Sequence, residues 1–187
     1  MKLLVEGVTL QCVQGDITRQ SDISAIVNAA NAQLAPGGGV AGAIHAAAGS
    51  GLAKACRALA PIHPGQAVIT KGYRLENDYI IHCLGPVFGR DEPADELLAN
   101  CYKEALALAD QHRIASVAFP AIATGAFGYP FEAAAEVASV AVVDASLRLK
   151  HVRHVRFVFH EPTGMNVFPK YLIRAVARLN EAKFAET

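Results

Sequence analysis

The chain has 187 residues, a length typical of one domain, and 52% of them are hydrophobic, enough for a sizeable core. Its 17 basic residues balance its 17 acidic ones. This balance argues against the basic face of a nucleic-acid-binding protein, so no nucleic acid is expected as a partner. An anionic ligand would have to be held by local dipoles and not by a general positive field.

The cysteines and the N-terminus exclude further classes. Cys12, Cys56, Cys83 and Cys101 lack C-x-x-C spacing, so we expect buried thiols and neither a metal site nor disulfides. No metal or cofactor is expected. The first ten residues are too short, and at Glu6 too polar, for a signal peptide. Because no run of about 18 apolar residues occurs, we expect no membrane association and a cytoplasmic protein.

Short β-rich runs alternate with helical patterns along the chain. The first two runs, Leu3–Val5 and Leu10–Val13, are expected to pair around Gly7. Further strands are expected at Ala25–Val27, Ala67–Thr70, Tyr79–Cys83, Ser116–Phe119 and Val155–Phe159. Several are nearly continuous apolar runs, which is typical of strands covered on both faces.

The segments between these strands carry helical periodicity. Val40 begins an apolar stripe with i, i+3, i+4 spacing, and Leu97 begins a second one. The Ala- and Val-rich segment Phe131–Leu149 suits close packing on a sheet, and Leu172 begins the apolar face of the last helix. Alternating strands and helices predict a three-layer α/β/α sandwich. In such sheets ligands bind outside the carboxyl ends of the strands.

The loop after the Ala25–Val27 strand carries the first chemical signal. It contains Asn28 and Asn31, which could merely end the strand because asparagine favours turns. Gly37–Gly39 then precede the helix that starts at Val40. Consecutive glycines let a backbone approach a ligand closely, and a helix N-terminus presents N–H donors at its positive end. This combination predicts a phosphate site.

The loop 120–128 repeats that arrangement after the strand Ser116–Phe119 and before a helix starting near Pro130. Two such loops on one sheet can hold a diphosphate from both sides. Phe127 lies between Gly125 and Gly128, a poor position for a core residue. It is expected to cover a ligand ring or sugar, with a surface plug as the alternative.

Several motifs occur together in a distinctive order. They are Gly15-Asp16-Ile17-Thr18, the segments 26–31, 37–45 and 46–49, then 69–73, 81–87 and 119–125. In this order they resemble the macro domain family from about Asp16 to Phe159, and are most similar to its MacroD-type branch. Members of that branch remove ADP-ribose from proteins and deacetylate O-acetyl-ADP-ribose. The resemblance implies one macro domain over residues 1–187, with a mixed central sheet of about six or seven strands.

The resemblance also implies an adenine site. Asp16 would accept a hydrogen bond from the adenine amino group, with the backbone of Ile17 beside the ring. Its alternative role is a solvated turn or a helix cap. Phe159 matches the aromatic residue that stacks on adenine in related domains, although a core phenylalanine at a strand end is the alternative.

The diphosphate and the distal ribose follow by the same resemblance. Backbone N–H donors to the diphosphate would come from Gly37, Gly38, Gly39, Val40, Ala41, Ala123, Thr124, Gly125, Ala126, Phe127 and Gly128. Asn31 matches the ribose-contacting asparagine, whose amide offers a donor and an acceptor to a diol. Asn31 and His45 are the candidate catalytic residues. His45 has a structural alternative, and Asn28 and His82 are interpreted as structural.

Two positions depart from the branch. Ala41 stands where MacroD-type hydrolases usually carry an aspartate that is thought to help activate the attacking water, and Ala123 stands where serine is common. Other macro domains, some of them viral, resemble Val40-Ala41-Gly42 and still hydrolyse, and in those a substrate phosphate is proposed to assist the water.

Three functions remain in competition. The first is hydrolysis at the distal ribose of mono-ADP-ribosylated protein or of O-acetyl-ADP-ribose. A second is binding of ADP-ribose without turnover, which Ala41 favours, and a third is removal of phosphate from ADP-ribose 1″-phosphate. A Rossmann-type oxidoreductase would need G-x-G-x-x-G after the first strand, and Gly37–Gly39 lack that spacing.

Overall fold

The computed structural model describes residues 1–185 and contains one seven-stranded sheet. Its strands are β1 (Lys2–Val5), β2 (Val8–Gln14), β3 (Ala25–Ala29), β4 (Ala67–Lys71), β5 (Tyr79–Cys83), β6 (Ser116–Phe119) and β7 (His154–Phe159). The spatial order is β1-β2-β7-β6-β3-β5-β4. The inner strands run parallel, whereas β1 and β4 pair antiparallel at the two edges.

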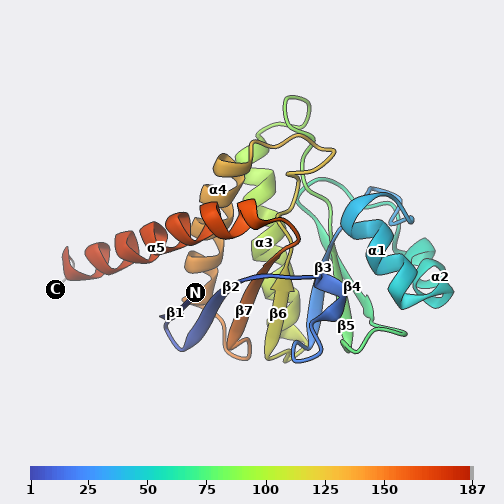
Figure 1. Cartoon of the computed structure of the whole chain (residues 1–187), viewed down its shortest axis with the longest axis horizontal. Coiled ribbons are helices and arrows are strands. Elements are labelled where there is room, and N and C mark those ends of the chain that lie inside the picture. Colours follow the sequence, from blue (N-terminus) through green and yellow to red (C-terminus); the bar gives the residue numbers. More distant parts are fainter. Residues whose placement is uncertain (186–187) are drawn as a thin grey trace.

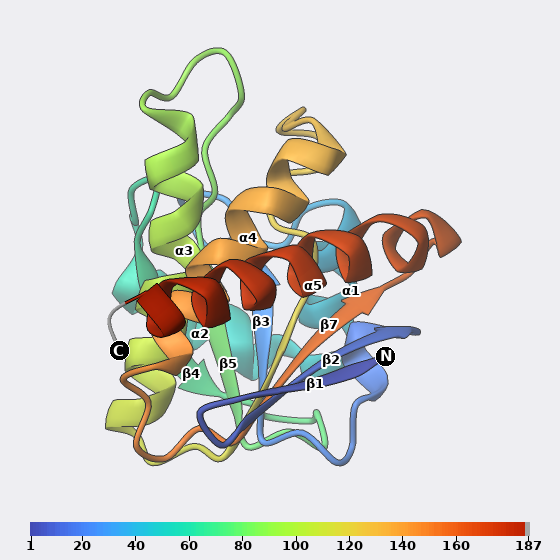
Figure 2. The same cartoon turned by 90° about the vertical axis from the view of Figure 1, so that its left-hand side faces the viewer.

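Helices cover both faces of this sheet. They are α1 (Gly39–Ala48), α2 (Ser50–Leu59), α3 (Ala94–Gln111), α4 (Phe131–Ser146), α5 (Pro162–Ala185) and a short 3₁₀ helix, η1 (Ile17–Arg19). Figure 1 shows α4 and α5 on the opposite side of the molecule from α1 and α2, and in Figure 2 α5 crosses in front of α4. The three-layer sandwich and the mixed sheet are therefore confirmed.

Alternation of side chains explains why the strands are apolar throughout. In β3, Val27 packs into the layer under α3, α4 and α5, whereas Ile26 packs into the layer under α1 and α2. The same alternation separates Phe157 from Val158 in β7. Successive residues of a strand point to opposite faces, so a sheet with two covers needs apolar residues at nearly every position.

Helix α2 is the element that the sequence patterns do not predict. It begins after Gly49, whose φ of 83° breaks the chain direction at the end of α1. Only Leu52 and Cys56 of its ten residues are buried, a stripe too short to stand out as a helical period. Several boundaries differ as well: α4 ends at Ser146, before Leu149, and β2 is longer at both ends than the predicted Leu10–Val13.

The interior agrees with the expectation for the cysteines, all four of which are buried and unpaired. Burial raises the pKa of the Cys12 and Cys101 thiols to about 12. Over residues 1–185, no helix is both long and apolar enough to cross a membrane.

Candidate functional site

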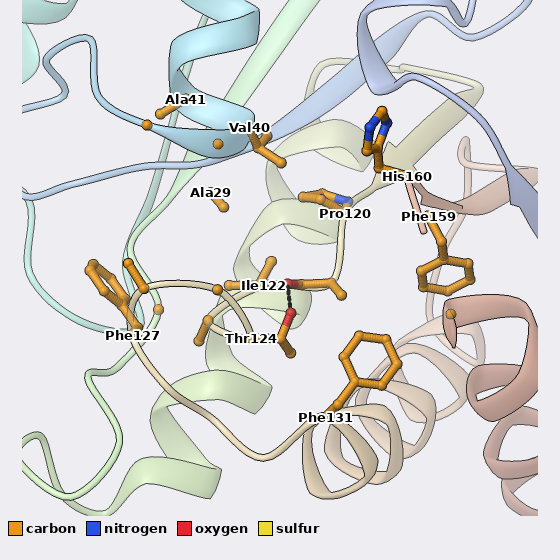
Figure 3. Close-up of a pocket in the computed structure, with 18 of the residues that line it drawn as sticks. Ala29, Val40, Ala41, Pro120, Ile122, Thr124, Phe127, Phe131, Phe159 and His160 are labelled. Atoms are coloured by element: carbon orange, nitrogen blue, oxygen red, sulfur yellow. Dashed lines mark hydrogen bonds between the residues drawn. The ribbon is translucent and has the colours of Figure 1, made fainter. Parts of the chain in front are cut away.

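A cavity of about 490 Å³ lies at the edge of the sheet where the carboxyl ends of β3, β6 and β7 meet. Its walls are residues 29–31 and 37–41, the loop 120–127, and residues 158–161 with 163 and 164, while Gly85 and Phe131 complete the lining. This volume falls within the usual range for small-molecule sites. In Figure 3, Phe127 lies at one end of the cavity, and Phe159 and His160 lie at the other.

The first wall is the glycine loop and the beginning of α1. Gly39 has a φ of 57°, a left-handed conformation that suits glycine, and it opens the helix. A methyl group at Gly42 would collide with the carbonyl group of Gly37, so the loop lies directly against the first turn of α1. The early N–H groups of a helix have no partner within it. They line the cavity at the positive end of α1, which suits an anion.

The second wall is the loop after β6, which is held by its own hydrogen bonds. Thr124 Oγ1 donates to the Ala121 carbonyl at 2.8 Å, as Figure 3 shows, and Tyr129 N donates to the Ala123 carbonyl at 3.0 Å. Ala123 takes a φ of 66° at this turn. Within the described residues no hydrogen bond is donated by the N–H groups of residues 124–127, which therefore remain for a ligand across from α1.

Asn31 sits between these walls but is already hydrogen-bonded within its own loop. Its Nδ2 donates to the Ala35 carbonyl at 2.8 Å, and its Oδ1 accepts from Ala35 N at 3.0 Å. An amide offers two donors and two lone pairs, so one donor and one acceptor position are still available for a ribose. These bonds hold the side chain at the cavity wall beside Gly37.

Phe159 lines the other end of the cavity and is also part of the core. Its ring lies 4.6 Å from that of Phe168, centroid to centroid, and only 4% of the residue is exposed. A side chain at Gly164 would collide with the Phe159 ring, so α5 approaches this ring at its closest there. The aromatic face available to a ligand is thus small and firmly positioned.

Asp16 and Ile17 lie beside this end without lining the cavity. Gly15 N donates to the Phe159 carbonyl at 2.9 Å, which places the turn against β7. Asp16 Oδ1 caps η1 by accepting from Thr18 N at 2.8 Å and Thr18 Oγ1 at 2.7 Å. These bonds lower the pKa of the Asp16 carboxyl group, so it stays ionised. Ile17 is buried in the apolar layer under α1.

A sequence model of the macro domain matches residues 27–138, which span the glycine loop, the β6 loop and the strands between them. The chain belongs to the macro domain family. It is 44% identical over 173 residues to a macro domain-containing protein of Cupriavidus necator, covering 90% of this chain and 99% of that one. It is also 44% identical over 168 residues to a Salmonella gallinarum protein named O-acetyl-ADP-ribose deacetylase, covering 87% and 93%.

Solved structures give the same family. The Oceanobacillus iheyensis macrodomain with ADP superposes with a TM-score of 0.90 at 36% identity, covering 95% of this chain and 97% of that one. A mutant of that macrodomain has been solved with ADPR.

The candidate catalytic histidine of this macro domain, His45, and the histidine interpreted as structural, His82, are both buried and do not line the cavity. His45 is buried on α1, and its ring lies beside the backbone of Leu34. Burial lowers the pKa of His45. His82 is fully buried and lies 3.1 Å from Asn28, measured from Nδ1 to Nδ2. The structure therefore favours the structural interpretation of all three, and Gly128 is also outside the lining.

The segment after β7 contributes residues that the sequence patterns do not predict. His160, Glu161 and Thr163 line the cavity beside Phe159. Their position just beyond a parallel strand was the available signal, because ligands gather at such ends. Among the lining residues, His160 and Glu161 carry the titratable side chains, and both lie at the Phe159 end. The remaining lining residues absent from the prediction are Ala29, Ala30, Gly85, Pro120, Ala121, Ile122, Phe131, Val158 and Gly164.

Proposed function

We propose that this macro domain binds ADP-ribose in the cavity and hydrolyses the ester at the distal ribose of ADP-ribosyl groups. Its substrates would be mono-ADP-ribosylated carboxylate side chains of proteins or O-acetyl-ADP-ribose. The observation that carries the proposal is one cavity with two loops rich in free N–H groups between two aromatic ends. A diphosphate fits between the loops, with adenosine toward Phe159 and the distal ribose toward Phe127.

The relatives support both parts of the proposal. The Salmonella gallinarum protein carries the name of a deacetylase acting on O-acetyl-ADP-ribose, and the Oceanobacillus iheyensis macrodomain has been solved with ADP and with ADPR.

Catalysis in this site would depend on positioning. Asn31 would hold the distal ribose with its remaining donor and acceptor, and the two loops would fix the diphosphate. Ala41 offers no base, and of the two titratable lining residues, His160 lies at the far end of the cavity in Figure 3 and Glu161 directly follows it in the chain. The attacking water would therefore lose its proton to a phosphate oxygen of the substrate. Correct placement alone supplies several kcal/mol toward a barrier.

A reader function is the second candidate, and a specific observation favours it. The wall at Ala41 presents only a methyl group where a general base would stand. Such a module would bind ADP-ribose as well as the hydrolase does but would leave the ester intact.

Substitution of Asn31 distinguishes the two candidates. Asn31→Ala should reduce single-turnover hydrolysis of an ADP-ribosylated protein far more than it weakens ADP-ribose binding, because alignment of ribose and water matters most in the transition state. We expect at least a tenfold larger loss in rate than in affinity, equivalent to about 1.4 kcal/mol. Hydrolysis is measured with enzyme in excess, and affinity by calorimetry.

Asn28→Ala is unsuitable as a control because Asn28 is buried, so Asn180→Ala, at an exposed position of α5 outside the cavity lining, serves instead and should leave the rate unchanged. If the wild-type protein binds ADP-ribose but hydrolyses the ester no faster than the enzyme-free control, the hydrolase is rejected and the reader function is retained. Equal rates in wild type and Asn31→Ala would retain an enzyme but remove Asn31 from its mechanism.

A further inference from the structure

A chain of hydrogen bonds behind the cavity ends at the turn that carries Asp16. The side chain of Gln20 is buried, and its Nε2 donates to the Asp16 carbonyl at 2.7 Å. The same carbonyl accepts from Arg19 N at 3.1 Å. The backbone of Gln20 is also held, because its carbonyl accepts from Asn77 Nδ2 at 2.8 Å and from Ile23 N at 3.0 Å. Gln20 thus connects a fixed backbone to the turn.

Arg156 orients the other end of the Gln20 amide. It lies on β7, two residues before Val158 of the cavity wall, and its side chain is 11% exposed. Its Nη1 donates to Gln20 Oε1 at 2.9 Å, and its Nε donates to Gln11 Oε1 at 3.0 Å. Nη1 and Nη2 also contact the two carboxylate oxygens of Asp22 at 2.8 and 2.6 Å.

The orientation of the Gln20 amide follows from these contacts. A guanidinium has donors only, so Arg156 accepts nothing and must face Gln20 Oε1. The amide NH₂ is then directed at the Asp16 carbonyl. Because the guanidinium is a planar fork with several fixed donors, it resists rotation better than a lysine would. None of these side chains lines the cavity, so this series of hydrogen bonds acts on the cavity through the Asp16 turn.

We propose that Gln20, oriented by Arg156, is a positioning residue that sets the Asp16 turn as the edge that selects the base of the ligand. The inference rests on the proposed function, since it assumes that an adenine lies between this turn and Phe159. A fixed carboxylate at this edge accepts from the 6-amino group of adenine and rejects a base with oxygen at that position. The energetic effect is therefore on selectivity between bases and not on the diphosphate.

Gln20→Glu tests the hydrogen bond from Gln20 to the Asp16 carbonyl directly. Glutamate keeps the length of the side chain and its pairing with Arg156, but it turns an oxygen toward the Asp16 carbonyl. We expect the dissociation constant of ADP-ribose to rise about three- to tenfold, the value of one hydrogen bond, while that of inosine diphosphate ribose hardly changes. The ratio of the two constants, measured by calorimetry, should fall toward one. A merely structural defect would weaken both ligands equally.

Asp22→Ala is the matched control, because it removes a partner of Arg156 while leaving both bonds of the Gln20 side chain. It should preserve the ratio. Thermal unfolding shows whether Gln20→Glu is folded. If it is not, Gln20→Met, which is uncharged and of similar length, repeats the test. An unchanged ratio in either folded Gln20 variant, or equal wild-type affinity for the two ligands, overturns this inference and leaves ADP-ribose binding intact. Wild type that binds neither ligand rejects the proposed function itself.

Discussion

Ala41 is one of the two positions, with Ala123, at which this macro domain departs from the MacroD-type pattern. It lies in the first turn of α1, is buried, and lines the cavity near the glycine loop. A methyl group there neither accepts a proton nor repels a diphosphate. A carboxylate at position 41 would therefore assist catalysis but weaken ligand binding. A single substitution can measure both effects.

Ala41→Asp should raise the single-turnover rate of ester hydrolysis by at least about tenfold, because a positioned general base contributes on that scale or above. The same carboxylate should weaken ADP-ribose binding several-fold through repulsion of the diphosphate, partly offset by the positive end of α1. Quenched single-turnover assays measure the rate of hydrolysis, and calorimetry measures the affinity for ADP-ribose. Ala41→Asn has the same size without a base, and a rate increase in that variant would contradict the explanation.

At the scale of elements, the contact between the glycine loop and α1 decides how the phosphate site is shaped. Gly42→Ala should weaken ADP-ribose binding by about tenfold, because its methyl group would displace the Gly37 carbonyl and the loop with it. Stability should fall as well, because the helix preference of alanine over glycine, up to about 1 kcal/mol, opposes but does not remove the cost of displacing a backbone carbonyl group. Calorimetry and thermal unfolding measure the two effects.

Ala43→Gly, at an exposed position of the same helix, is the control: it should also lower stability but leave the affinity for ADP-ribose unchanged. A Gly42→Ala protein that binds ADP-ribose normally would show that the loop does not depend on this contact.

Elements with a strong physical signature were predictable from the sequence. The strands stand out because both faces are covered, and the phosphate loops because glycine is costly unless a close approach requires it. Helix α2 was missed because two buried residues do not make a period. His160 and Glu161 were missed because they belong to no recognisable motif. Only their position directly after β7 brings them to the cavity.

Roles within a loop were harder to predict than its location. Asn28 and Asn31 are close in the sequence, yet the strand buries the first against His82 and leaves the second at the cavity. Asp16 was predicted to accept a hydrogen bond from adenine, with a helix cap as the alternative, and the structure shows the cap on η1. Such division of roles depends on distant partners such as His82, which local patterns do not reveal.

Across the whole molecule, a buried polar cluster lies within the layer under α1 and α2. His82 Nδ1 accepts from Asn28 Nδ2, and His82 Nε2 lies 2.9 Å from Thr70 Oγ1. The amide NH₂ can only donate, so the Nδ1 atom must carry no proton and the ring must be neutral. Burial lowers the pKa of His82 to about 4, and the nearby His45 contributes to that shift.

Stability should therefore fall with acidity in a defined window. The unfolded chain binds a proton at His82 near the ordinary pKa of 6.5, whereas the folded protein resists it down to about pH 4. The free energy of unfolding should drop as pH falls through this interval, by about 3 kcal/mol in all. Urea unfolding between pH 7 and 4.5 measures the slope.

His82→Gln removes this titration, so its slope over the same interval should be shallower, with other groups whose pKa is lowered by burial, His45 and His154 among them, supplying the remainder. Identical slopes in the two proteins would rule out His82 as the source.

The place of β2 in the sheet has a consequence for how the chain folds. Within the described sheet, β1 and β2 join the other strands only through β7. Gln14 at the end of β2 pairs with Phe159 at the end of β7, although most of the sequence lies between them. During synthesis the first hairpin emerges early but has no neighbour until residues 154–159 follow. Contacts so distant in sequence slow folding because loop closure precedes their stabilisation. We therefore expect the Asp16 turn, which follows the hairpin, to become ordered only after β7 has formed beside it, so that the Phe159 end of the cavity forms late.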